Sequence, residues 1–176
     1  MPRSHLVSEA QSRTPPLRAQ TPSVRRGHRR LACDRVVGQP RRVRRPLPSI
    51  AVVVSFIDAI NRGDLERLAE LMSDDHRLQV LDEPPLEGRA ANVEAWRGYA
   101  DAFPSYVIYP ETIVGRGETV AVLGRTTGSH LALPDDEELR LTIIWRAEVS
   151  GERVRLWQLV EDTPASRVAL GLPTGE

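Results

Sequence analysis

The sequence has no lysine, a single cysteine and no long apolar run. All 24 basic residues are arginines, a bias that we interpret as GC-rich coding and not as a binding feature. Because Cys33 stands alone, no intrachain disulfide can form. The apolar run at residues 50–54 is far shorter than the roughly 20 residues of a membrane-spanning helix. Since the N-terminus also lacks an apolar leader, these absences predict a soluble, cytoplasmic protein without membrane contacts.

The net charge of zero hides two unlike segments. Residues 1–48 carry 12 arginines against two acidic residues, a net charge of +10, whereas residues 49–176 carry 12 arginines against 22 acidic residues, a net charge of −10. The first segment is rich in Arg and Pro and has no apolar periodicity, so we expect a disordered tail. It could be a basic arm on nucleic acid, a transit peptide, or upstream coding sequence translated from a start codon placed too early.

The arginine clusters at 25–26, 29–30 and 41–45 are not interleaved with aromatic residues. Base stacking is therefore unavailable to the tail, and nucleic acid is not the partner that we expect. We favour the misplaced start codon and look for function after residue 48.

Apolar spacing predicts three helices between residues 50 and 103. The first ends at Gly63, because glycine readily takes the left-handed conformation found just past a helix. Asp64 is placed to cap the second helix, and Pro104 ends the third. The apolar stripes are Ile50, Val53, Val54, Ile57 and Ile60 in the first helix, Leu65, Leu68, Ala69 and Met72 in the second, and Val93, Trp96, Ala100 and Phe103 in the third.

From residue 76 onward the pattern indicates strands. His76, Leu78 and Val80 alternate with polar residues, so we expect these three side chains to face the interior. The later strands are expected at 106–114, 119–129, 138–149 and 152–161, with an acidic loop at 131–137. Helices followed by a meander of strands predict an α+β domain over residues 49–165, with residues 166–176 as a C-terminal tail.

The last hairpin can be placed in register if residues 150 and 151 form a two-residue turn. Val149 then pairs with Glu152, and Arg140 lies opposite Glu161. One face of this hairpin is apolar apart from Gln158 and Asp162, two polar groups that a ligand pocket would explain. The apolar members of that face are Leu139, Leu141, Ile143, Trp145, Ala147, Val154, Leu156 and Val160.

Short motifs recur along the chain: INRGDL at 60–65, then LMSDDH, LEGR before the third helix and FP after it, TGSH at 127–130, and LWQLVED at 156–162. In this order they resemble the nuclear transport factor 2-like superfamily, and within it the SnoaL-like (polyketide cyclase-like) branch. The resemblance covers about residues 50–165. It implies a cone-shaped α+β fold in which a curved antiparallel sheet wraps around about three N-terminal helices. It also implies a small apolar ligand inside the cone and a homodimer formed through the outer face of the sheet.

The resemblance does not bring a complete set of catalytic residues. Ketosteroid isomerases of the superfamily use a carboxylate base with a Tyr and a protonated Asp, but the matching positions hold Val80, Phe56 and Ile143. Limonene-epoxide hydrolases use an Asp-Arg-Asp relay, of which Asp162 alone is matched, since the other two positions fall near Leu141 and Ile143. SnoaL-type cyclases rely on little more than one acid–base Asp in an apolar cone, which keeps Asp162 as a candidate.

We therefore take Asp162 and His76 as the candidate catalytic residues. An apolar wall that raises the pKa of a carboxyl group can make it a base, and histidine titrates near neutral pH. Each also has a structural interpretation, as a solvent-facing or turn-capping carboxylate and as a hydrogen-bonded histidine. The residues expected to bind ligand are Gln158, Trp96, Tyr99, Phe56, Trp145, Val80 and His130. No spacing of His, Cys or acidic residues indicates a metal site, and we expect no cofactor.

Two functions stay open at this point. The first is a cofactor-free cyclase, isomerase or hydrolase that acts by acid–base chemistry on a small apolar substrate. The second is a non-catalytic ligand-binding or dimerisation module of the same fold, because the catalytic positions are mostly vacant. A buried Asp162 beside a cavity, with His76 or Gln158 within hydrogen-bond reach, would favour the enzyme.

Overall fold

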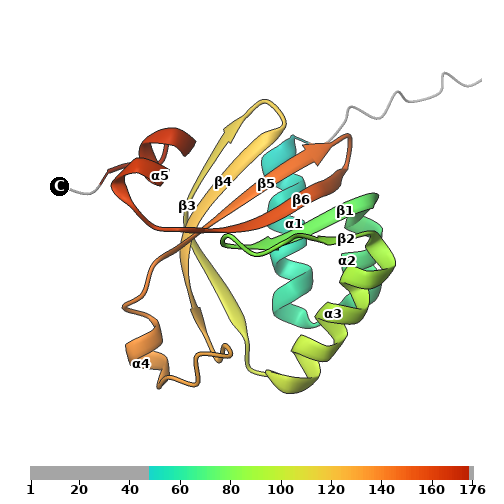
Figure 1. Ribbon diagram of the computed structural model, residues 1–176, viewed down its shortest axis with the longest axis horizontal. Helices are drawn as coiled ribbons and strands as arrows, with labels where there is room; N and C mark the ends of the chain where they lie inside the picture. Colours follow the sequence, from blue (N-terminus) through green and yellow to red (C-terminus); the bar gives the residue numbers. More distant parts are fainter. Residues whose placement is uncertain (1–47, 175–176) are drawn as a thin grey trace, which may run out of the picture. The chain divides into compact units, whose positions relative to one another are not determined.

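The computed structural model describes residues 48–174 (Figure 1). The predicted Arg-rich tail, apart from Pro48, lies outside these residues. Among the helices of the described segment, none is long and apolar enough to cross a membrane.

Five helices and one six-stranded sheet form the described segment, which confirms the expected α+β class. The helices are α1 (Ser49–Arg62), α2 (Leu65–Leu71), α3 (Arg89–Ala102), α4 (Asp135–Glu138) and α5 (Pro164–Leu170). The strands are β1 (Met72–Val80), β2 (Leu86–Glu87), β3 (Val107–Arg116), β4 (Thr119–Thr127), β5 (Ile143–Ser150) and β6 (Arg153–Glu161). They lie in the order β2-β1-β6-β5-β4-β3. All neighbouring strands are antiparallel except β1 and β6, which run parallel.

The junction between α1 and α2 forms for the reasons that the sequence suggests. Gly63 ends α1 in the left-handed conformation, at φ 63°, where residues with a side chain are disfavoured. The carboxylate of Asp64 then accepts a hydrogen bond of 2.9 Å from the backbone N–H of Arg67 and caps α2.

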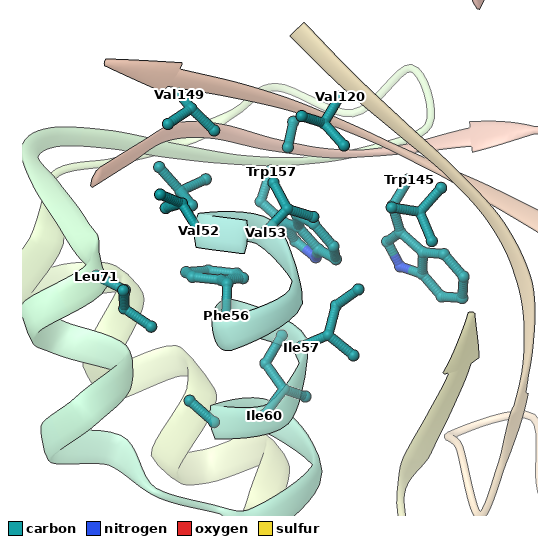
Figure 2. Packing of buried hydrophobic residues seen from close by; sticks show 14 of the residues in the cluster. Val52, Val53, Phe56, Ile57, Ile60, Leu71, Val120, Trp145, Val149 and Trp157 are labelled. Carbon is teal, nitrogen blue, oxygen red and sulfur yellow. The ribbon is translucent and has the colours of Figure 1, made fainter. Parts of the chain in front are cut away.

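The core lies between α1 and the face of the sheet that we call the inner face (Figure 2). Phe56 and Ile57 of α1 point toward Trp145 and Trp157, which descend from β5 and β6. All four side chains are at most 3% exposed. A fully buried side chain of this size contributes roughly 1.5–3 kcal/mol, so this contact holds the sheet on the helix. The buried residues of α1 are Val52, Val53, Phe56, Ile57, Ala59 and Ile60.

The predicted apolar stripe of α1 is wrong at two positions. Ile50 and Val54 are 40% and 45% exposed, whereas Val52 and Phe56 are buried. Positions two apart are separated by about 200° around a helix axis, so the exposed pair lies nearly opposite the buried pair. The helix is turned so that the row with the larger aromatic side chain faces the sheet.

The strand expected at 138–149 begins later, at Ile143, because residues 135–138 form α4. The side chain of Glu138 is buried and binds the hydroxyl of Thr126 at 2.5 Å and the backbone N–H of Ser129 at 3.2 Å. These bonds hold the segment outside the strand ladder. Arg140 therefore does not lie opposite Glu161, whose partner is Ile143. The boundary expected after residue 165 falls inside α5.

The predicted register of the last hairpin is wrong in two ways. Ser150 pairs with Arg153, so residues 151 and 152 form the turn. Val149 thus pairs with Val154 and not with Glu152. A shift of two residues by itself keeps every side chain on its predicted face of the sheet. The register then shifts again, since Val149 pairs with Val154 whereas Glu148 pairs with Leu156. The extra residue is a β-bulge, and a shift of one residue moves all later side chains to the opposite face.

Because of this bulge, Trp157 and Leu159 of β6 face α1, and Gln158 does not. Gln158 lies beside Arg146 on the opposite side of the sheet, which we call the outer face. The prediction that Gln158 and Asp162 share a face with Trp145 is therefore wrong.

A second register shift, between Pro110 and Thr112 in the pairing of β3 with β4, gives a test of the fold. Gly124 lies opposite Pro110, next to this irregularity, and a Cβ there would overlap the backbone carbonyl of Tyr109. We expect Gly124→Ala to lower the free energy of unfolding in urea by about 1–3 kcal/mol. The matched control is Gly98→Ala on α3, where a Cβ meets no atom within 4 Å; it should raise stability by about 0.5–1 kcal/mol. Equal stability of the two variants would contradict the described β3–β4 register.

Candidate functional site

His76 is the buried polar side chain of the inner face. It lies on β1, is 0% exposed, and its ring centre is 5.7 Å from that of Phe56. Its Nδ1 lies 2.8 Å from the carbonyl oxygen of Val154. A carbonyl only accepts hydrogen bonds, so Nδ1 carries the proton and Nε2 presents a lone pair. Nε2 is buried and has no hydrogen-bond partner among the described residues.

The surroundings of His76 keep the imidazole neutral. Burial is the largest influence and lowers the pKa of His76, outweighing the Val154 carbonyl and Asp75, which act in the opposite direction. A neutral imidazole with a fixed Nδ1–H is oriented to accept a proton or a hydrogen bond at Nε2. The inward parity predicted for His76 is thus confirmed, and the structure adds its tautomer.

The three tryptophans of the sequence lie on the same side as His76. The ring centres of Trp145 and Trp157 are 6.3 Å apart in a stacked arrangement, and Phe56 lies 5.1 Å from Trp157. Trp96 of α3 packs against this cluster. The indole N–H groups of all three tryptophans are buried without an acceptor among the described residues. Buried donors normally have partners, so three unpaired donors on one side mark it as a place where a polar atom could bind.

The inner face is not completely covered by side chains. Leu78, Val80, Ile143 and Leu159 point to the same side as Trp157 but are only half-buried. Val80, expected to bind ligand, lies beside Leu159 of β6. These partly exposed aliphatic residues lie on the same side of the sheet as the buried donors.

A second aromatic group joins α3 to the loop after β4. The hydroxyl of Tyr99 lies 3.3 Å from Nδ1 of His130, and the backbone N–H of His130 donates to the same hydroxyl at 3.4 Å. Tyr99 also contacts Phe103 and Tyr106, with ring centres 4.8 and 5.0 Å away. Burial raises the pKa of Tyr99 and of Tyr106, so both phenols stay protonated near neutral pH. His130 itself is exposed.

Asp162 lies apart from the inner-face cluster. Its carboxylate accepts hydrogen bonds from Nε and Nη2 of Arg167 at 2.6 and 2.7 Å, and a third from the hydroxyl of Thr142. The Arg167 bond is the main cause that lowers the pKa of Asp162. A general base in an apolar site needs the opposite shift. The partners expected for Asp162, His76 and Gln158, are not those that it has, and its observed contacts attach α5 to the end of β6.

The structure thus divides the predicted site residues into three groups. Phe56, His76 and Trp145 come together, joined by Trp157; the register predicted from the sequence put its neighbour Gln158 on the inner face and therefore Trp157 on the outer face. Trp96 and Tyr99 lie on α3 at the edge of this cluster, and Tyr99 contacts His130. Gln158 binds Arg146 on the outer face at 3.2 Å, and Asp162 binds Arg167.

Within residues 48–174, no group of three or more His, Cys, Asp or Glu side chains could hold a metal ion.

Comparison with known proteins supports the fold. A family model for the SnoaL-like domain matches residues 53–157. No curated protein matches the chain in sequence.

Solved structures share the fold at low sequence identity. A proposed polyketide cyclase from Sinorhizobium meliloti has a TM-score of 0.53 and 20% identity, covering 64% of this chain and 99% of its own. A proposed SnoaL-like polyketide cyclase from Jannaschia sp. has a TM-score of 0.53 and 18% identity, covering 72% and 93%. A proposed ketosteroid isomerase from Kribbella flavida has a TM-score of 0.51 and 19% identity, covering 73% and 90%. At these identities the similarity establishes the fold alone.

The ion pair at Asp162 predicts a specific stability effect. The side chains of Arg167 and Asp162 are 20% and 8% exposed, and hydrogen bonds to charged groups contribute about 1.5–3 kcal/mol. We expect Asp162→Asn to lower the free energy of unfolding in urea by about that amount. In the wild type this contribution is present above the ordinary carboxyl pKa of 3.8 and is lost as the pH falls through the lowered value.

The matched control is Asp58→Asn, which removes an exposed pair with Arg62 and should change stability by less than about 0.5 kcal/mol. Equal effects of the two substitutions would contradict the structural role of Asp162.

The burial of His76 predicts that the free energy of unfolding depends on pH in a higher range than the one set by Asp162. Its pKa in the folded state is lowered from 6.5, so the unfolded chain binds the proton more strongly. Stability is therefore complete above about pH 6.5 and decreases as the pH falls below it. Urea unfolding at about pH 7.5 and about pH 5.5 should show this loss in the wild type and a smaller loss in His76→Gln. His130→Gln, at an exposed position, should behave as the wild type does; a wild-type pH dependence in His76→Gln would show that His76 is not buried as a neutral group.

Proposed function

The chain belongs to the SnoaL-like domain family of the nuclear transport factor 2-like superfamily, and we propose that it is a cofactor-free acid–base enzyme acting on a small, mainly apolar molecule. His76 is the proposed proton acceptor. The observation that carries this proposal is the free Nε2 of His76, buried on the same side of the sheet as three indole donors that also lack partners. In this role His76 replaces Asp162 as the principal catalytic candidate, because the carboxylate of Asp162 is occupied by Arg167.

The inner face carries a proton acceptor and hydrogen-bond donors on separate side chains. This arrangement supports proton transfer at a carbon atom. The Val154 carbonyl holds Nδ1–H, so that Nε2 is aimed as a lone pair and cannot rotate away without breaking that bond. An indole N–H is a donor only, so Trp145, Trp157 or Trp96 could stabilise an oxygen on which negative charge develops. A base and a donor on one apolar surface are the minimum needed to take a proton from the carbon next to a carbonyl and to stabilise the enolate.

The substrate follows from the same residues. The inner-face residues that remain partly exposed are aliphatic or aromatic, among them Leu78, Val80 and Ile143. They would contact the hydrocarbon body, and the unpaired donors would bind one carbonyl or hydroxyl oxygen. We therefore propose a compact, enolisable carbonyl compound as the substrate class.

A second function, ligand binding without catalysis, is favoured by the apolar residues Phe56, Val80 and Ile143 at the positions where related isomerases carry their catalytic groups. It differs from the first in one respect: the ligand would bind to the indoles without losing a proton to His76.

The homodimer expected from the resemblance is also a proposal, with the part of the outer face outside α5 as its interface.

The test uses 2-tetralone, a small apolar ketone with exchangeable protons. Binding should change the fluorescence of Trp96, Trp145 and Trp157, which are all the tryptophans in the chain. Exchange of the α-protons in D₂O, followed by proton NMR, should be faster than in buffer alone. We expect His76→Gln to slow the enzyme-catalysed exchange by about 10²-fold or more while fluorescence still reports binding.

His130→Gln and Asp162→Asn serve as controls and should retain exchange in the folded protein. Binding without faster exchange would support the non-catalytic function, whereas neither binding nor exchange would exclude this ligand class. Full exchange activity in His76→Gln would show that His76 is not the base.

A further inference from the structure

The outer face of the sheet carries a separate cleft, beneath α5. Its volume is about 250 Å³, and Val114, Arg116, Thr119, Ala121, Arg146, Ala169 and Leu170 line it. These residues come from β3, β4, β5 and α5, which lies across the sheet on the side away from α1 (Figure 1). The cleft is therefore distinct from the inner face and from the function proposed for it.

The walls of the cleft combine an apolar floor with two guanidinium groups. Ala121 belongs to a small buried apolar cluster on the outer face, against which Val114 and Leu170 pack. Arg116 and Arg146 supply positive charge, and none of the lining residues is acidic. A site of this kind discriminates in favour of an anion that has a hydrocarbon body.

The positive charge of the cleft is only partly neutralised by the described residues. Arg116 forms no ion pair within residues 48–174. Arg146 contacts Glu148, but the same carboxylate also binds Arg155 at 2.5 Å. One acidic group is thus shared by two guanidiniums, and Arg146 retains donor capacity.

The guanidinium of Arg116 lies close to the end of α5. Gly171 follows α5 at φ 71°, a left-handed conformation that glycine adopts without strain. A Cβ at position 171 would overlap the Arg116 guanidinium. Glycine is therefore favoured at position 171 for its backbone conformation, and the Arg116 guanidinium occupies the space beside it.

The helix that forms the upper wall is itself fixed. Arg167 binds Asp162 with two hydrogen bonds and the carbonyl oxygen of Pro173 with a third, at 3.1 Å. Thr163 caps the first turn, and Leu172 is buried on the outer face. A wall held in this way gives the cleft a defined shape before any ligand binds, which reduces the entropic cost of binding.

We propose that this cleft binds a small monocarboxylic acid with a compact aliphatic or aromatic body. The carboxylate would accept hydrogen bonds from Arg116 and Arg146, since guanidinium groups match carboxylate geometry. The hydrocarbon body would lie on Val114, Ala121 and Leu170. A volume of about 250 Å³ is slightly below the usual range for drug-sized ligands, so the acid must be small.

The experiment is a titration of the ¹⁵N-labelled full chain with sodium octanoate, followed by two-dimensional amide NMR. The shift changes should saturate and should be largest at Thr119, Ala121, Ala169 and Leu170. Octanamide has the same body without the charge and should bind at least about tenfold more weakly. Inorganic phosphate has charge without a body and should also bind more weakly than octanoate.

Three variants locate the site. Arg116→Gln should weaken octanoate binding about tenfold, and Ala169→Phe should block the cleft by filling it. Arg153→Gln removes an equal charge from an exposed position at the start of β6 and should leave binding unchanged. The matched control separates a specific contact from a general loss of positive charge.

Shift changes at Phe56, Trp145 and Trp157 in place of the cleft residues would overturn the proposal, as would octanoate binding unaltered in both Arg116→Gln and Ala169→Phe. Equal binding of octanamide would exclude a carboxylate site, and equal binding of phosphate would exclude a role for the apolar floor. His76→Gln should bind octanoate as the wild type does, so this result does not depend on whether the inner face is catalytic.

Discussion

The extra residue that β6 inserts opposite β5, between Val154 and Leu156, determines which side chains of the last strand reach the helices. A strand alternates its side chains between two faces, so one additional residue exchanges the faces for everything that follows. Trp157 is thereby placed against Phe56 of α1, and this contact is central to the core in Figure 2. Without the bulge, Gln158 would face α1 and the tryptophan would face the outer side.

The two faces of the sheet have different chemistry because of this arrangement. On the inner face, apolar surroundings keep His76 neutral and leave the indole donors without acceptors. On the outer face, arginines and acidic residues form ion pairs, and Asp162 remains ionised beside Arg167. Hydrogen bonds and charges are stronger in surroundings that exclude water, so an unpaired donor on the inner face has a greater effect on a bound molecule than one at the surface.

Much of the architecture could be predicted from local patterns. Gly63 and Asp64 end one helix and begin the next through their own backbone and side-chain geometry. Period-two alternation placed His76 on the inner face correctly. By contrast, α4 is helical in part because Glu138 binds Thr126 and Ser129, twelve and nine residues away in the sequence. Short acidic segments carry no sign of such contacts, since the same residues are usually solvated.

By itself, the sequence determined the α+β class, the helix boundaries near Gly63 and the family resemblance, because these depend on periodicity, glycine conformation and short motifs. The tertiary structure decided which face each residue of β6 occupies, and with it the separation of His76 from Asp162. The physical reason is that a bulge is a property of the strand pair: its location follows from how Trp157 packs against α1 and how Glu148 pairs with Arg146 and Arg155. The role of Asp162 was decided in the same way, when α5 brought Arg167 to its carboxylate.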